Sequence, residues 1–79
     1  MKQHKFKKMA LDLIELVPND RFQVEYKYNI IWFVHFDKRY PKNVKTKYID
    51  NDIDDERTML IKFERFKKVL KGECLLDEI

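Results

Sequence analysis

Apolar residues are densest in residues 30–36, and both alternate positions of this run are largely apolar. A short run rich in β-branched and aromatic side chains is typical of a strand and is too short to span a membrane. A strand that is apolar on both faces is usually covered on both. We therefore predict that residues 30–36 form the central strand of a small sheet.

The preceding stretch, residues 21–29, alternates apolar and polar side chains, as a strand with one solvent-exposed face does. A two-residue loop before the central strand would place Glu25 on the face of Trp32. A three-residue loop, residues 27–29, would instead gather large apolar side chains on one face: Phe22, Val24, Tyr26, Ile30, Trp32, Val34 and Phe36. We expect the three-residue loop, because Asn29 tolerates the left-handed backbone that such a loop needs at its last position.

This register makes the opposite face of the sheet half apolar, since Gln23 and Glu25 then lie beside Ile31, Phe33 and His35. Two helices cannot easily cover both sides of a three-stranded sheet, so we expect Ile31 and Phe33 to be partly exposed. Exposed apolar groups ringed by polar residues mark an interaction site. We assign Ile31, Phe33 and His35 to partner binding, with a second copy of the chain as one candidate occupant.

Helical periodicity appears on both sides of the strands. From Phe6, apolar residues recur at spacings of three and four until Pro18, which ends the helix. The same periodicity covers residues 55–71, with Asp52 or Asp54 as the expected N-cap and Gly72 as the C-cap.

Residues 44–49 alternate again, which predicts a third strand. Lys45 and Lys47 lie on its polar side, where lysines discourage unwanted pairing of an edge strand. The predicted fold class is α+β, one domain over residues 1–79 in the order helix, three-stranded antiparallel meander, helix, with both helices mainly on the Trp32 face. Residues 1–5 form a basic arm and residues 73–79 a C-terminal tail.

Composition removes several classes of site. A single glycine excludes a glycine-rich phosphate loop, and two histidines with one cysteine are too few for a usual structural zinc site. The acidic run 50–56 opens like a calcium loop, but Asp55 stands where that loop needs glycine and Ile61 where it needs glutamate. We expect neither a metal nor another cofactor.

Cys74 cannot form an internal disulfide, and the sequence contains no signal peptide or transmembrane run. These features predict a cytoplasmic protein that does not enter a membrane. Catalytic chemistry is also not indicated: His35 and Asp37 share one strand parity, but no local signature joins them to Cys74 or another nucleophile. We therefore expect a protein that is not an enzyme.

Basic and aromatic residues are interleaved between positions 38 and 48, and the net charge is +3. Basic side chains can follow phosphates while aromatic rings stack on bases, so this segment is a candidate nucleic-acid surface. Its residues are Lys38, Arg39, Tyr40, Lys42, Lys45, Lys47 and Tyr48. The alternative interpretation is a solvated loop beside a protected edge strand.

The function we expect is non-catalytic binding to a protein partner. A small lysine-rich domain without catalytic chemistry suits an inhibitor or adaptor of a larger assembly, of the kind that phages and mobile elements encode. Nucleic-acid binding through residues 38–48 is the alternative, and a homodimer through the Ile31 and Phe33 face is compatible with either.

Overall fold

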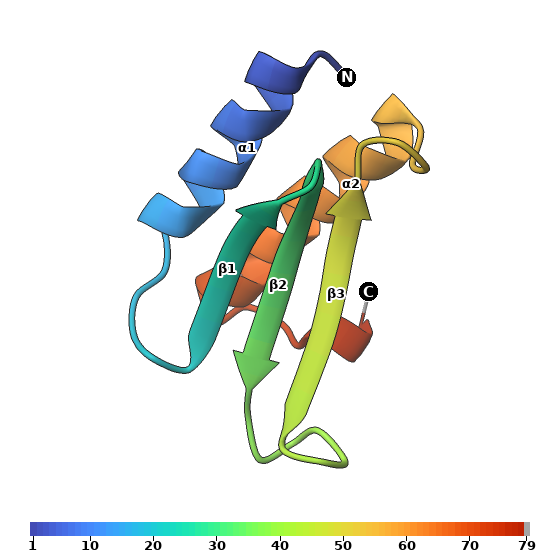
Figure 1. Ribbon diagram of the computed structural model, residues 1–79. Coiled ribbons are helices and arrows are strands. Elements are labelled where there is room, and N and C mark those ends of the chain that lie inside the picture. The colour runs from blue at the N-terminus through green and yellow to red at the C-terminus, as the bar shows by residue number, and fades with distance from the viewer. Residues whose placement is uncertain (79) are drawn as a thin grey trace.

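The computed structural model describes residues 1–78 and confirms the predicted α+β fold (Figure 1). Its elements, in chain order, are helix α1 (Gln3–Glu15), strands β1 (Phe22–Lys27), β2 (Ile30–Phe36) and β3 (Val44–Asp50), helix α2 (Glu56–Leu70) and a short 3-10 helix, η1 (Leu76–Glu78). Helix α1 begins inside the stretch predicted as a basic arm. None of the helices in the described part of the chain has the length and apolar character needed to cross a membrane.

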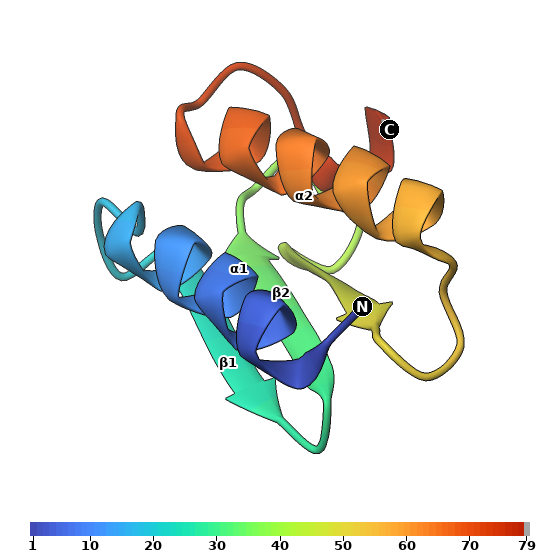
Figure 2. The same cartoon turned by 90° about the horizontal axis from the view of Figure 1, so that it is seen from above.

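The strands form an antiparallel sheet in the order β1-β2-β3, and helix α2 lies behind it in the view of Figure 1. Seen from above, α1 and α2 form a helical layer over the sheet (Figure 2). Aromatic pairs join the two layers across a core whose other buried residues are mainly aliphatic. Phe33 on β2 packs against Phe66 on α2 with ring centroids 4.6 Å apart, and Phe6 on α1 packs against Tyr26 on β1 at 5.9 Å.

The expected three-residue hairpin loop is wrong. Tyr26 pairs with Ile31 and Lys27 with Ile30, so the loop consists of Tyr28 and Asn29 alone. Both loop residues have positive φ, 54° and 63°, which is the type I′ geometry whose twist matches that of the flanking strands. The geometry of the two-residue turn therefore outweighs the gathering of apolar side chains on one face, which was the basis for predicting a three-residue loop.

A register shift of one residue exchanges the two faces of a strand, because side chains alternate with period two. Ile31, Phe33 and His35 consequently lie beneath the helices with exposed fractions of 0%, 0% and 4%, whereas Trp32 is 36% exposed on the other face. The assignment of Ile31, Phe33 and His35 to partner binding is wrong, and so is a homodimer through that face.

The acidic segment before α2 caps that helix, but through Asp55 and not through Asp52 or Asp54 as expected. Asp55 is the N-cap and accepts a 2.7 Å hydrogen bond from the backbone N–H of Thr58. Asp54 instead accepts the backbone N–H of Asp50 at 3.0 Å and pairs with Lys62 at 2.9 Å. These contacts fix the end of β3 to the start of α2.

The core assignment can be tested by comparing two truncations on neighbouring positions of β2. Phe33→Ala should lower the free energy of unfolding by about 3–5 kcal/mol, because it leaves a cavity against Phe66. Trp32→Ala should lower it by only about 1–2 kcal/mol, because the indole is partly solvated in the folded chain. Urea unfolding followed by circular dichroism measures both; an equal loss for the two variants would contradict the observed register.

Candidate interaction surface

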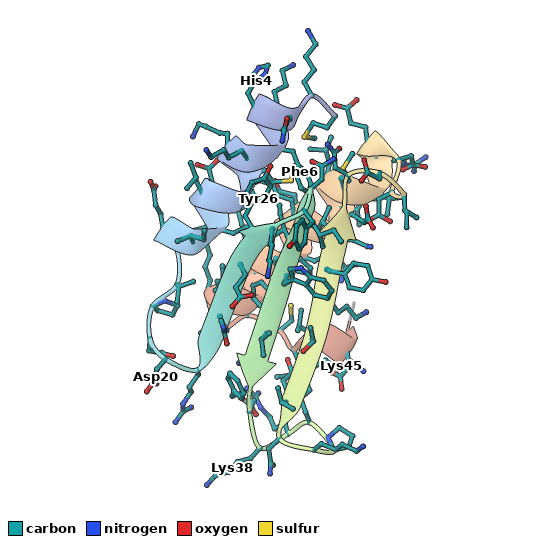
Figure 3. All side chains as sticks on the ribbon, in the orientation of Figure 1. His4, Phe6, Asp20, Tyr26, Lys38 and Lys45 are labelled. Atoms are coloured by element: carbon teal, nitrogen blue, oxygen red, sulfur yellow. The ribbon has the colours of Figure 1, made fainter. Side chains whose placement is uncertain are left out.

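Within residues 1–78, no helix lies over one face of the sheet, and a row of apolar side chains runs along the centre of that face. Residues of even number on β2 point to this face, which we call the open face: Ile30, Trp32, Val34 and Phe36. Figure 3 shows the sheet from this side, with α2 again behind the strands. Phe36 at 44% exposed and Trp32 at 36% exposed are its most solvated members.

Strand β3 widens this apolar row on one side. Its register places Tyr48 beside Trp32 and Val44 beside Phe36. The Trp32 and Tyr48 rings lie 5.2 Å apart at an interplanar angle of 45°, and Tyr48 is 47% exposed. Aromatic rings of this kind supply large contact area at little entropic cost, which is why they are enriched at protein interfaces.

Strand β1 borders the open face with polar side chains. Glu25 lies opposite Trp32 and Gln23 opposite Val34, and the Gln23 amide donates a 2.8 Å hydrogen bond to the Glu25 carboxylate. Lys27 follows at the hairpin end. The open face is therefore an apolar row with a polar border, the arrangement that marks an interaction site.

Two cations near the open face, Lys62 and Arg39, are already paired with carboxylates. Lys62 lies 5.7 Å from the Tyr48 ring centroid, but its ammonium binds the Asp54 carboxylate. Arg39 makes two hydrogen bonds to Asp37, of 2.9 and 2.8 Å. The Arg39 guanidinium beside Asp37 holds the pKa of that carboxyl well below its usual range, so the pair stays ionised.

The predicted nucleic-acid residues do not share one surface. Lys38 and Lys42 lie in the exposed loop between β2 and β3, and Lys38 is labelled at the lower end of Figure 3. Lys45 and Lys47 have the opposite strand parity to Tyr48, so they project toward the helical side. Tyr40 is 1% exposed and cannot stack on a base.

Tyr40 and His35 instead form a buried polar network with the C-terminal segment. The Tyr40 hydroxyl accepts a 2.8 Å hydrogen bond from the backbone N–H of Leu76 and lies 2.7 Å from His35 Nδ1. The hydroxyl proton is free to be donated to Nδ1; in that arrangement the ring proton of neutral His35 lies on Nε2, which is 3.9 Å from Asp37. The network ties β2, the β2–β3 loop and η1 together.

Cys74 lines a cavity of about 160 Å³ together with His35 and Asp37. This grouping of thiol, imidazole and carboxylate is the one catalytic arrangement that the sequence raised. His35 Nδ1 is hydrogen-bonded to Tyr40, and Nε2 lies 3.9 Å from Asp37. Among the described residues no hydrogen bond joins the Cys74 thiol to a base, and nucleophilic catalysis by cysteine depends on such a base.

The residues that the sequence analysis missed are Trp32, Phe36 and Val44, which were expected in the core or on an edge. The signal that could have found them was the dipeptide Tyr28-Asn29, since a two-residue turn fixes the register of the hairpin. No protein-family model, curated protein or solved structure matches this chain.

The buried network predicts a pH dependence of stability. Burial lowers the pKa of His35, an effect that Arg39 and Arg21 reinforce and Asp37 opposes. The unfolded chain therefore takes up this proton first as the pH falls through about 6.5, and the folded chain loses stability over that range. Urea unfolding should give a lower free energy at pH 5.5 than at pH 7.5. His35→Gln should flatten this dependence and His4→Gln, on the exposed part of α1, should not; equal profiles for all three proteins would contradict the assignment.

Removing the Tyr40 hydroxyl should loosen the C-terminal segment. In Tyr40→Phe the Leu76 N–H and His35 Nδ1 lose their partner inside the core, which should lower the free energy of unfolding by about 1–3 kcal/mol. Hydrogen exchange measured by nuclear magnetic resonance should show faster exchange at the Leu76 amide. Tyr48→Phe, which removes an exposed hydroxyl, is the matched control, and an unchanged Leu76 exchange rate in Tyr40→Phe would refute the network.

Proposed function

We propose that this protein is a non-catalytic protein-binding module, and that its open sheet face docks onto a protein partner. The observation that supports this is the uncovered apolar row on β2, widened by Tyr48 and Val44 on β3. Such a row exposes aromatic groups that would be buried if they served only stability. A chain of this size suits an inhibitor or adaptor that blocks or bridges a larger assembly.

The charges around the open face favour a protein over a nucleic acid. Binding of a polyanion depends on cations that neutralise successive phosphates. Glu25 instead stands directly beside Trp32, and the lysines of β3 project to the other side of the sheet. Three further cations border the face: Lys27 at the hairpin end, and Arg21 and Lys38, which line a depression beside Phe36 at the other end. An apolar centre with mixed charges at its border is the composition of a protein interface.

A second exposed apolar pair lies on the outer face of α2 and serves as an internal comparison. Leu60 and Ile61 are 47% and 49% exposed, which is similar to the aromatic residues of the open face. They are surrounded by Arg57, Glu64 and Arg65 on the same helix. This pair is small and is separated from the open face by the thickness of the sheet and the core.

Capture from nuclease-treated lysate of the native cells tests the proposal. Three immobilised baits are compared: the wild-type chain, Trp32→Gln/Phe36→Gln, and the control Leu60→Gln/Ile61→Gln. We expect the wild type and the control to retain one protein that the open-face variant loses by at least tenfold in mass-spectrometric intensity. Circular dichroism first establishes that all three baits are folded.

Two results would contradict the proposal. If wild-type capture depends on intact nucleic acid and disappears after nuclease treatment, the alternative of nucleic-acid binding holds. If instead the α2 variant loses the captured protein and the open-face variant keeps it, the docking surface is the outer face of α2.

A further inference from the structure

Strand β3 lies at one edge of the sheet (Figure 1). Its hydrogen bonds show which of its backbone groups point away from the sheet. The Tyr48 carbonyl accepts a hydrogen bond from Lys62, and the Asp50 N–H donates to Asp54, so the even residues of β3 point outward. The flanking odd residues point inward, since the Asn51 N–H donates to Asn29 and the Asn43 carbonyl accepts from Asp37. Successive residues of a strand alternate in this way.

The outward edge of β3 is occupied at one end and open at the other. Lys62 and Asp54 occupy its α2 end, as described above. Further along the strand, Val44 and Thr46 have the same outward direction, and within residues 1–78 their outward backbone groups have no hydrogen-bond partner. The short helix η1 packs behind β3, with Leu76 bonded to Tyr40 in the core. The stretch from Val44 to the Tyr48 N–H is therefore a template for an additional strand.

The lysines of β3 determine which strand can be added. Residues that face one another in an antiparallel pair share a face of the sheet, and like charges directly opposite are destabilising. If two copies of β3 paired around Lys45, Thr46 or Lys47, each register would set a lysine against a lysine. Within the described residues neither lysine forms an ion pair with a carboxylate. Pairing with a second, identical copy is therefore disfavoured at this edge.

The same lysines favour an acidic strand, and the small size of the open face favours a contact that continues onto the edge. Three strands about 4.8 Å apart and about 23 Å long present roughly 330 Å² in projection. A stable interface removes about 800 Å² from each partner, so a partner must extend beyond this face. We propose that the open stretch of β3 receives an extended segment of the protein partner, with carboxylates facing Lys45 and Lys47 and apolar side chains continuing the open face beside Tyr48.

This inference rests on the proposed protein-binding function, because it specifies how a protein partner engages the same sheet. Strand addition supplies affinity through backbone hydrogen bonds and specificity through alternate side chains. The partner segment is thereby defined by its chemistry: an extended run in which acidic and apolar residues alternate. The carboxylates meet the helical side of β3, and the apolar residues meet the open face.

A charge-reversed version of the chain itself is a suitable probe. In Lys45→Glu/Lys47→Glu, the edge carries carboxylates at the positions that should face the lysines of the wild type. Mixing the two proteins at about 0.05 M salt should give a one-to-one heterodimer, detected by sedimentation velocity and native mass spectrometry. Each protein alone should stay monomeric, and its self-association should be at least tenfold weaker. The heterodimer should weaken with added salt, which screens exposed charges.

Matched variants separate strand pairing from general attraction between opposite charges. Lys5→Glu/Lys7→Glu makes the same change of net charge on α1 and should not associate with the wild type. Thr46→Pro removes one outward N–H without removing a bond to β2, so this substitution in both partners should abolish the heterodimer. If the doubly reversed chain is unfolded by circular dichroism, Lys47→Glu alone replaces it as the probe.

A mixture that remains monomeric overturns the inference, and so does equal association of the α1 control. Dimers of the wild-type chain alone that Thr46→Pro abolishes would also overturn it, because they would show that the lysines do not prevent self-pairing. None of these results bears on capture through Trp32 and Phe36, so failure of the edge inference is distinguishable from failure of the proposed function.

Discussion

The turn at Tyr28-Asn29 is the constraint on which the rest of the structure depends. It fixes which residues of β1 and β2 face each other, and thereby which side of the sheet the helices cover. Contacts distant in sequence hold it in place. The Asn29 carbonyl accepts the backbone N–H of Asn51 at 3.1 Å, and the Asn29 side chain donates to Asp52 at 3.0 Å. The side-chain amide of Asn51 donates to the Met1 carbonyl at 2.8 Å, which brings the N-terminus to the same end of the sheet.

The sequence was sufficient to predict the element order, because each element carries its own period. The apolar spacing of α1 and α2, Pro18 and Gly72 are local signals of helix extent. The register was not predictable from the same information. Both parities of β2 are apolar, so hydrophobicity alone does not distinguish the Trp32 face from the Phe33 face. The backbone conformation of Tyr28 and Asn29 determined which face of β2 the helices cover, and it opposed the register that would gather more apolar side chains on one face.

The predicted site residues were wrong because neither the hairpin register nor a contact between distant residues can be read from local periodicity. Ile31 and Phe33 were assigned to a surface because the register was one residue out, and Tyr40 was read as exposed because its partners are distant. Tyr40 is bonded to His35 and to Leu76, 36 residues further along the chain. A hydrogen bond between residues so far apart produces no periodic pattern in the sequence from which it could be predicted. Lys45 and Lys47 were correctly expected on one parity of an edge strand, where they lie.

The position of Trp32 has a spectroscopic consequence. It is the chain's single tryptophan, and it stands on the open face in contact with Tyr48 rather than in the core. Its fluorescence therefore reports on the solvation of that face, with little sensitivity to the packing beneath the helices. A partner that covers the face should shift its emission to the blue, whereas loosening of the core should leave it nearly unchanged. The chain thus carries its own optical label at the proposed docking surface, and no dye needs to be attached to observe binding there.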